Sequence, residues 1–550
     1  MSKIKIFSLG GLNENGKNMY VVDVDNNIFI FDAGLKYPST SMLGVDYIIP
    51  KLDYIKENYD RIKGIFISHG HDGNMGAVPD ILEMFPDIPV YATKFSMELL
   101  KIELEKYKIK AGNLKEVRPH SKINFNDNLI IFPIAMTHVL PEVVSYVLYT
   151  DDGAIVYATD FLFDSTMLGP YKTDIGKLAY VGKQGVLCLM SESSYADKVG
   201  YTSPKHHIAD LVWNTISRAE GRVIITLFAN NLYHVQEILE SVMKTNRKVV
   251  LMGKELQEIV KKAMEFGYLN FDKDRIGDLK NINDKDAVIL VSEHRESNFS
   301  AIEKILNNYD KYIVLKETDT IFLTELVYSN NEKKFAALLD NIARKNVEVV
   351  HLSNKQNLSY HASQQDLMMI INLMNPKYYF PIKGEYRLQY LNATVAEMAG
   401  VSKDHIILKQ NGDAAIFENG TLEEGNMHIH TDSILIDGKN VDDVGELVLK
   451  DRDMLSTNGI VIVTATLDKL SKKVIAGPQI FTRGFIYVKE NQEMINKTAL
   501  ICMEVLNEVI VSNQKVDYQK VKNEIRDKLG LFFEKETGSK PMIITVIQEV

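Results

Sequence analysis

The chain has 550 residues, which is too many for one hydrophobic core and predicts two or three domains. Its content of 45% hydrophobic and 25% charged residues is ordinary for a soluble globular protein. No apolar run reaches the roughly 18 residues that a membrane span needs. The net charge of −10 argues mildly against a nucleic-acid partner, because phosphate binding usually needs a basic surface, although an acidic chain can contain a basic groove.

Two features of the sequence predict a cytoplasmic location. The only cysteines, Cys188 and Cys502, are far apart and have no partners at metal-binding spacing, which excludes a disulfide framework and fits a reducing compartment. The first six residues run directly into a strand-like segment and lack the apolar core of a signal peptide. We therefore expect a soluble cytoplasmic protein without a membrane span.

Short β-branched runs alternate with helical patterns along most of the chain, which predicts an α/β fold. Many of the runs are almost wholly apolar, as expected of strands covered on both faces. The predicted strands are Asn27–Phe31, Gly64–Ser68, Ala154–Thr159, Val186–Met190, Arg222–Phe228, Lys248–Met252, Ala287–Val291, Lys311–Leu315, Glu348–Leu352 and Lys377–Ile382. The predicted amphipathic helices are Met97–Tyr107, His234–Thr245, Asn331–Arg344 and Gln364–Leu373.

The last quarter of the chain has its own pattern. The tract from Glu418 to Gly445 is rich in Gly, Asn and Asp, which is typical of a linker. Beyond it we expect a small separate α/β domain. Its predicted elements are a strand at Ile460–Leu467, helices at Glu493–Val511 and Tyr518–Phe533, and a final strand at Met542–Glu549.

Several polar side chains directly follow apolar runs. They are Asp32, His69, His138, Asp160 and Lys383. Polar groups just past the carboxyl ends of buried strands are where α/β sheets build their sites. His71 lies two residues beyond His69, close enough for both imidazoles to bind one ion, and with His138 and Asp160 they match a ligand set for zinc or manganese.

Each of these residues also has a simpler explanation. A single histidine after a strand is more often a hydrogen-bonded loop residue than a ligand, so His138 alone carries little weight. His69 and His71 together favour the metal. Asp160 alone could be a helix N-cap. The pair His428-Ile429-His430 lies in the predicted linker without a third partner, and we do not count it as a metal site.

The segment Ser68–Gly76 carries half of a known binuclear motif. Its residues Ser68-His69-Gly70-His71-Asp72-Gly73-Asn74 resemble the His-x-His-x-Asp-His motif of metallo-β-lactamase-type nucleases, with Gly73 and Asn74 at the last two ligand positions. In the intact motif, the first two histidines bind one metal, and the aspartate and last histidine bind the other.

Over essentially its whole length the chain resembles the β-CASP branch of the metallo-β-lactamase superfamily, and specifically the ribonuclease J family. The segments that carry the resemblance are Leu9–Tyr20, Asp32–Lys36, Met42–Asp46, Ala158–Phe161, Leu187–Ser193, Tyr360–Gln364, Pro381–Arg387, Ser456–Ile460 and Arg483–Phe485. The resemblance implies a four-layer αββα metallo-β-lactamase domain with an inserted β-CASP α/β domain and a small C-terminal α/β domain. The expected boundaries are 1–205 and 356–420 for the first domain, 206–355 for β-CASP, 421–449 for the linker and 450–550 for the last domain.

The resemblance also implies an unequal pair of metal positions. The first keeps its whole ligand set, which is His69, His71, His138 and Asp160. The second would have lost three ligands, which are replaced by Gly73, Asn74 and Lys383 and leave only the bridging Asp160. We therefore expect at most one divalent ion per chain, zinc or manganese. One ion cannot stabilise both the attacking and the leaving oxygen, as two ions about 3.5–4 Å apart do.

Lys383 has two interpretations, which the sequence leaves open. Its ammonium could reach Asp160, supply positive charge where the second metal is missing and contact a scissile phosphate, or it could be a solvated surface lysine. By resemblance, His361 lies near the scissile phosphate, and Asp32 and Glu192 support the site.

The RNA-binding segments of the family are present in altered form. By resemblance, the residues expected to contact RNA are Ala229, Asn230, Asn231, Asn357, Leu358, Ser359, Tyr360 and His361. Tyr360 stands where the family has a glycine and would narrow the RNA channel. The segment Val291–Glu296 lacks the glycines that the family has there. These departures lead us to expect weakened recognition of the RNA 5′ phosphate as well as weakened catalysis.

The resemblance implies a ribonuclease J of the degenerate, second-paralogue type. We expect an RNA maturation and decay factor with a 5′-to-3′ exoribonuclease or endoribonuclease fold of weak or lost activity. It would bind 5′-monophosphorylated single-stranded RNA and an active paralogue, in homo- and hetero-oligomers. The alternative is a non-catalytic structural or regulatory subunit of such a complex. A small-molecule hydrolase is disfavoured, because the long insertion between Glu192 and His361 suits a macromolecular substrate.

Overall fold

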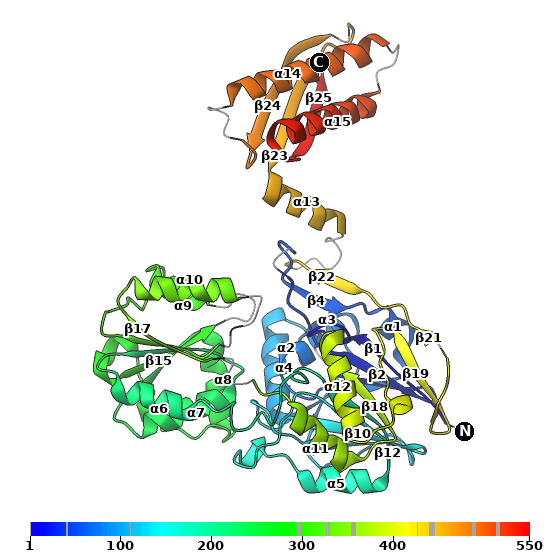
Figure 1. Cartoon of the computed structure of the whole chain (residues 1–550), viewed down its shortest axis with the longest axis vertical. Coiled ribbons are helices and arrows are strands. Elements are labelled where there is room, and N and C mark those ends of the chain that lie inside the picture. The colour runs from blue at the N-terminus through cyan, green and yellow to red at the C-terminus, as the bar shows by residue number, and fades with distance from the viewer. Residues whose placement is uncertain are drawn as a thin grey trace. The chain divides into compact units, whose positions relative to one another are not determined.

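The computed structural model describes residues 2–39, 42–110, 112–293, 299–325, 327, 331–353, 359–425, 427–438, 446–471, 473–486, 491–512 and 517–550. The chain forms two compact units (Figure 1). The first consists of Met1–Tyr37 and Ile48–Ile434, and the second of Pro38–Tyr47 and Leu435–Val550. The candidate site lies entirely in the first unit.

Two mixed β-sheets form the centre of the first unit. One has the order β20-β19-β1-β2-β3-β5-β6-β7, with β21 paired to β19, and the other has the order β18-β12-β11-β10-β9-β8. The first sheet's strands are β1 (Lys3–Gly10), β2 (Met19–Val24), β3 (Asn27–Phe31), β5 (Ile62–Phe66), β6 (Val90–Thr93), β7 (Leu114–Val117), β19 (Asp413–Glu418), β20 (Thr421–Leu422) and β21 (Met427–His428). Those of the second are β8 (Ile123–Asn124), β9 (Ile130–Ala135), β10 (Val144–Thr150), β11 (Gly153–Ala158), β12 (Val186–Glu192) and β18 (Tyr378–Ile382).

Aromatic side chains hold the two sheets together. Phe31 and Phe66 from the first sheet pack with Tyr146 and Tyr157 from the second, and the rings of Phe31 and Tyr157 stack at 5.4 Å. Alternate residues of each strand face this layer, while the others face the helices outside. Helix α4 (Lys94–Tyr107) packs on β6 and β7, and helices α5 (Ile175–Gln184), α11 (Gln364–Met374) and α12 (Tyr386–Met398) pack on the second sheet. The predicted αββα layers are confirmed.

The insertion between β12 and β18 contains a third sheet, which is entirely parallel (Figure 1). Its order is β14-β15-β13-β16-β17. The strands are β13 (Val223–Phe228), β14 (Lys248–Met252), β15 (Ala287–Glu293), β16 (Thr320–Leu323) and β17 (Glu348–His351), and the helices around it are α6 (Ala209–Arg218), α7 (Leu232–Met243), α8 (Lys254–Glu265), α9 (Ser300–Leu306) and α10 (Glu332–Ala343). This is the α/β insertion that the sequence predicts.

The second unit contains a small sheet of order β24-β23-β25. Its elements are α13 (Glu446–Asn458), β23 (Ile460–Leu467), β24 (Val474–Arg483), α14 (Gln492–Ser512), α15 (Tyr518–Thr537) and β25 (Met542–Glu549). Every second residue of β23 is buried, because α14 and α15 cover one face of the sheet. The sequence predicted this α/β unit, but strand β24 was not among the predicted elements.

One predicted strand is wrong. Residues Lys311–Leu315 form no strand, and the chain instead forms β16 a few residues later. The backbone amides of Tyr312 and Ile313 donate to the carboxylate of Asp310, so a side chain satisfies donors that a neighbouring strand would otherwise satisfy. Tyr312 is 59% exposed, whereas all of β16 is buried. Residues Lys311–Leu315 therefore form an irregular segment, and only their apolar sequence resembles that of a strand.

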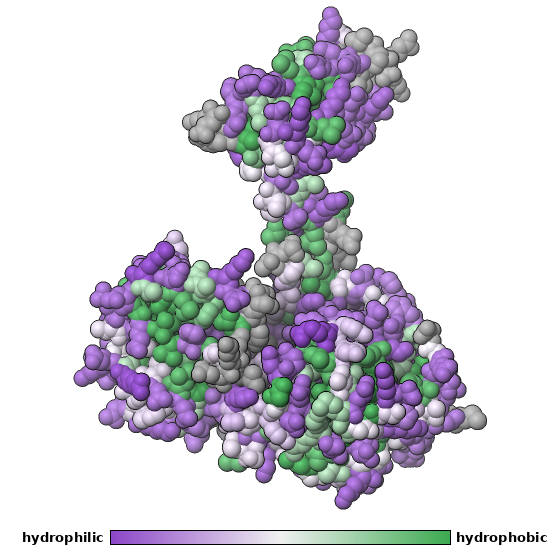
Figure 2. Space-filling model, viewed as in Figure 1, coloured by the Kyte–Doolittle hydropathy of each residue, from purple (hydrophilic) through white to green (hydrophobic). Residues whose placement is uncertain are grey.

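Hydrophilic residues cover much of the face that Figure 2 shows, and apolar residues form smaller patches between them. Among the described residues, no helix combines the length and apolar character that crossing a bilayer requires.

The buried ion pair Arg222–Asp319 stabilises the insertion, and its loss should destabilise the chain. Arg222 donates from Nε and Nη2 to the fully buried Asp319. We predict that Arg222→Ala lowers the free energy of unfolding by about 3–5 kcal/mol, because Asp319 stays buried without its partner. Urea unfolding measures this effect. The exposed pair Lys3–Glu418 gives the control, since Lys3→Ala should cost at most about 1 kcal/mol. Equal effects of the two substitutions would contradict the prediction.

Candidate metal centre and cleft

The candidate site residues lie on loops that follow the carboxyl ends of strands. Asp32 follows β3, His69 follows β5, Asp160 follows β11 and Lys383 follows β18. Asp32, Asp160 and Lys383 have φ values of 60°, 48° and 58°, in the left-handed region that non-glycine residues rarely adopt. Such conformations persist where the surroundings enforce them, and they are concentrated at functional sites.

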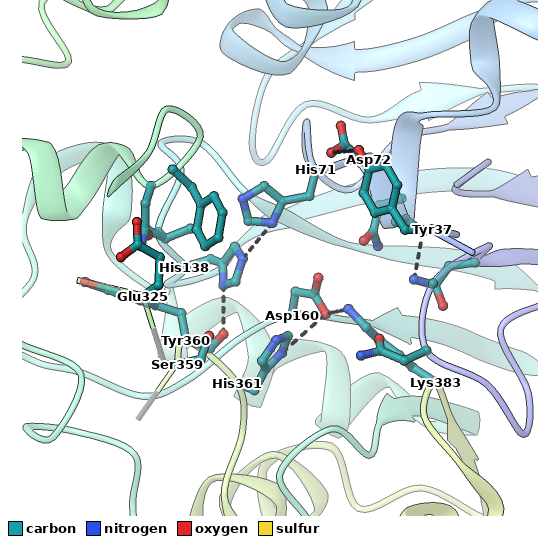
Figure 3. A pocket seen from close by; sticks show the side chains of 18 of the residues that line it. Tyr37, His71, Asp72, His138, Asp160, Glu325, Ser359, Tyr360, His361 and Lys383 are labelled. Atoms are coloured by element: carbon teal, nitrogen blue, oxygen red, sulfur yellow. Dashed lines mark hydrogen bonds and ion pairs between the residues drawn. The ribbon is translucent and has the colours of Figure 1, made fainter. Parts of the chain in front are cut away.

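Three imidazoles and one carboxylate converge on one point. His69 Nε2 lies 3.1 Å from both His71 Nδ1 and Asp160 Oδ2. His138 Nε2 lies 3.3 Å from His71 Nδ1 (Figure 3). All four residues are buried. Burial lowers the pKa of His138 well below its ordinary value, so its imidazole is neutral, as a metal ligand must be.

The outer ring nitrogen of each histidine faces an oxygen. The contacts are His69 Nδ1 to Ser68 Oγ at 2.9 Å, His71 Nε2 to the Asn230 carbonyl oxygen at 3.5 Å and His138 Nδ1 to the Tyr360 carbonyl oxygen at 2.8 Å. Carbonyl oxygens only accept, so His71 and His138 donate outward. Ser68 Oγ donates to Asp32 and therefore accepts from His69. All three inner nitrogens thus carry lone pairs that face one another.

Lone pairs at this separation repel one another unless an ion lies between them. Orientation of imidazole ligands by outer hydrogen bonds is the usual arrangement around protein-bound metals. The donor set of three nitrogens and one carboxylate oxygen matches what zinc prefers. The residues present therefore fit a divalent metal ion.

Lys383 lies on the other side of Asp160. Its Nζ contacts Asp160 Oδ1 (Figure 3). Asp160 Oδ2 faces His69. Burial alone would raise the pKa of Asp160, but the Lys383 ammonium holds it well below its usual range. Lys383 is only 5% exposed, which excludes the solvated surface lysine. Of the two interpretations left open, the structure agrees with an ammonium paired to Asp160.

Gly73 and Asn74 stand where the resemblance predicts lost metal ligands, and both make local hydrogen bonds. Asn74 donates from Nδ2 to Asp32, whose carboxylate also accepts from the Ser68 amide and hydroxyl and from Tyr157. Burial raises the pKa of Asp32, and these donors together with His69 counteract the shift. The Gly73 carbonyl accepts from the backbone and side chain of Asn18. A Cβ at Gly73 would lie 3.7 Å from its nearest neighbours, so there is space for a side chain.

His361 lies beside Asp160 and is held by Glu192. Glu192 Oε2 accepts from His361 Nδ1 at 2.7 Å, and Oε1 accepts from the amides of Phe161 and Ala362. Glu192 is fully buried, whereas the His361 side chain is 22% exposed. The arrangement leaves the imidazole open to the cleft with a carboxylate behind it.

A cleft of about 560 Å³ opens next to these groups. Its walls come from both the lactamase-like part and the inserted α/β part. Among its lining residues are His71, His138, Asp160, Asn231, His234, Glu325, Ser359, Tyr360, His361 and Lys383. Tyr360 is buried and packs edge-on against His138 at 6.1 Å between ring centroids.

The expected RNA contacts are distributed unevenly. Ser359, Tyr360, His361 and Asn231 line the cleft, Asn230 contacts His71 through its carbonyl oxygen, and Ala229 is buried. Asn357 and Leu358 lie outside the described residues.

Sequence reasoning missed the outer contacts of the ligands. Ser68 and Tyr157 belong to the Asp32 network, and the Tyr195 hydroxyl oxygen accepts a hydrogen bond from the backbone amide of Ser359. Ser68 directly precedes His69, so the sequence itself indicates a polar partner for this histidine. Tyr157 and Tyr195 lie on β11 and after β12, and only the tertiary structure brings them to the site.

A four-layer αββα fold with this cluster at the ends of its strands defines a metal-dependent hydrolase of the metallo-β-lactamase type. The chain matches the models of the metallo-beta-lactamase superfamily at residues 12–217, the ribonuclease J beta-CASP domain at 220–342, the Zn-dependent metallo-hydrolase RNA specificity domain at 346–407 and the ribonuclease J C-terminal domain at 447–550.

Its curated relatives agree with these matches. "Ribonuclease J2" of Bacillus subtilis (strain 168) is 34% identical, over 100% of this chain and 99% of the relative. "Ribonuclease J 2" of Staphylococcus aureus (strain NCTC 8325 / PS 47) is 33% identical, over 100% and 98%. The chain belongs to the ribonuclease J family. A solved protein of unknown function from Enterococcus faecalis V583 shares the fold alone, with a TM-score of 0.52 and 14% identity over 76% of this chain and all of that one.

The outer hydrogen bonds should govern metal affinity. We predict that Ser68→Ala weakens zinc binding about 10- to 100-fold, because His69 loses the acceptor that orients its ring. Competition with a chromophoric chelator measures the affinity. Ser145→Ala is the matched control, since the Ser145 hydroxyl is buried on β10 and has no hydrogen-bond partner within the described part of the chain. An unchanged affinity in Ser68→Ala would exclude this role.

Proposed function

We propose that this chain is an RNA maturation and decay ribonuclease that works with one divalent ion and has low 5′-to-3′ exonuclease activity on 5′-monophosphorylated RNA. One observation supports this most directly. The cluster of His69, His71, His138 and Asp160 is complete, while Lys383 occupies the other side of Asp160. The proposal thus combines a retained first metal position with a lost second one.

Zinc or manganese at this cluster would supply Lewis-acid chemistry to a phosphoryl oxygen. Lys383 would provide fixed positive charge beside Asp160 and attract the scissile phosphate. The Lys383 ammonium cannot replace a second ion fully, because it cannot generate a nucleophile from water. We attribute the low nuclease rate to the absence of a second metal ion that could activate the attacking water.

His361 would serve as the proton donor. Its Nδ1 is held by Glu192, and its exposed edge faces the cleft, so Nε2 is free to reach the leaving oxygen. The Glu192 carboxylate would stabilise the imidazolium before the proton is transferred. Asp32 would act at a distance, by orienting His69 through Ser68.

RNA would enter between the two parts of the first unit. The cleft contains Ser359, Tyr360 and Asn231, in the segments expected to contact RNA. Tyr360 contributes a buried ring where the family has a glycine, which supports a narrowed channel. Since half of the metal site is lost, we also propose that the chain assembles with an active paralogue, as homo- and hetero-oligomers.

The activity is tested with the purified chain, manganese and 5′-monophosphorylated RNA, beside the double variant His69→Ala/His71→Ala. We expect slow nucleotide release by the parent and at least about a 100-fold loss in the variant, because the first ligand pair is gone. His428→Ala is the matched control, since that exposed histidine pairs only with Asp413 among the described residues and should leave the rate unchanged. If parent and variant are equally inert, the chain is instead a non-catalytic subunit.

The second metal position should be recoverable. We predict that Gly73→Asp/Asn74→His/Lys383→His raises the nuclease rate by at least about tenfold, because these changes restore the ligands of a second ion. There is space for the side chain at Gly73. The rate and the metal content per chain are measured together. Lys383→His alone is the control and should not raise the rate. A folded triple variant that binds a second ion without becoming faster would contradict the assignment of the low rate to the lost metal.

A further inference from the structure

A second group of metal-ligating side chains lies outside the site described above. Asp164 lies in the loop after β11, and His206 and His207 lie just before α6, where the inserted part begins. Their ligand atoms all lie within 4.8 Å of one another. None of the three residues belongs to the cluster around His69.

The distances fit ligands of a common ion. The Nε2 atoms of His206 and His207 lie 3.1 and 2.9 Å from Asp164 Oδ2. Bonds of about 2.0–2.2 Å to a tetrahedral zinc ion place neighbouring ligand atoms about 3.3 Å apart. The rings of His206 and His207 lie side by side, with 4.1 Å between their centroids.

His206 gives the second, independent sign of a ligand. Its side chain is fully buried, and neither ring nitrogen has a hydrogen-bond partner within the part of the chain that the structure describes. Its Nε2 lies 3.1 Å from Asp164 Oδ2, the same oxygen that His207 Nε2 faces. A buried imidazole without partners is unfavourable and requires an explanation.

His207 shows the arrangement of an oriented ligand. Its Nδ1 lies 2.8 Å from Glu237 Oε1 on α7, while Nε2 faces Asp164. A metal-bound histidine usually donates a hydrogen bond from its other ring nitrogen to a carboxylate, which fixes the orientation of the ring. The remaining oxygen of Asp164 accepts from the amide and hydroxyl of Thr166, so its carboxylate is also fixed.

The alternative without a metal explains only part of this group. A protonated His207 would bridge Asp164 and Glu237 and satisfy all three of these groups. It would leave His206 Nε2 next to an Asp164 oxygen that already accepts from His207, without a hydrogen bond of its own among the described residues. An ion bound by Asp164 and by the Nε2 atoms of both histidines accounts for the convergence of these three atoms.

We propose that Asp164, His206 and His207 bind a zinc-class divalent ion, with Glu237 orienting His207. Two nitrogens and one oxygen leave a position for water or a further ligand. The site would join the loop after β11 to the first residues of the insertion. His206 also lines the cleft and packs against Tyr360 at 4.8 Å between ring centroids, so the ion would stabilise one cleft wall.

The test separates this site from the first one. The full-length His69→Ala/His71→Ala variant is stripped with a chelator and titrated with cobalt(II), whose visible absorption reports nitrogen and oxygen ligands. We expect one cobalt per chain, with loss of that absorption when His206→Gln is added. Zinc should raise the melting temperature of the first variant and not of the second.

His206→Gln is chosen because the His206 ring makes no hydrogen bond that its loss could break within the described residues. Asp164→Asn in the same background is the second variant and should also remove the cobalt signal. The control is His120→Gln, which alters another histidine–carboxylate pair, with Asp174, and should change nothing. The proposal is overturned if the first variant binds no cobalt, or if binding persists unchanged in both His206→Gln and Asp164→Asn. Neither outcome depends on nuclease activity.

Discussion

The central constraint in this molecule is the need to neutralise the Asp160 carboxylate. Asp160 is buried at the end of β11, in a strained backbone conformation, and faces histidines on one side. A buried carboxylate without positive charge nearby is strongly unfavourable. In an intact binuclear site, ions provide that charge. In this chain the ammonium of Lys383, at the end of β18, provides positive charge beside Asp160.

The Asp32 network has a parallel role on the other side of the site. Four donor groups converge on its carboxylate, and one of them, Ser68 Oγ, determines which nitrogen of His69 carries the proton. Asn74 is one of these donors. Asn74, which stands where the resemblance predicts a lost metal ligand, therefore supports the orientation of His69 through Asp32 and Ser68.

Much of this fold could be predicted from the sequence. The central strands are covered on both faces, so their sequences are almost wholly apolar and can be recognised as strands. The cluster of His69, His71, His138 and Asp160 was also predictable, since each residue follows such a run. The predicted strand at Lys311–Leu315 is wrong because the Asp310 carboxylate accepts hydrogen bonds from the backbone amides of this segment. The group of Asp164, His206 and His207 could not be found by spacing. Only the return of the chain after β12 brings the histidines to Asp164.

The outer partners of the ligands have a consequence for energetics. His71 donates to the carbonyl oxygen of Asn230, in the inserted part, and His138 donates to that of Tyr360, in the return segment. Three separate stretches of chain thus set one metal affinity. If RNA entering the cleft tightens these contacts, it raises the affinity for the ion, and the ion must then raise the affinity for RNA by the same factor. Substrate and metal would be positive heterotropic ligands of one another, coupled through two backbone carbonyls.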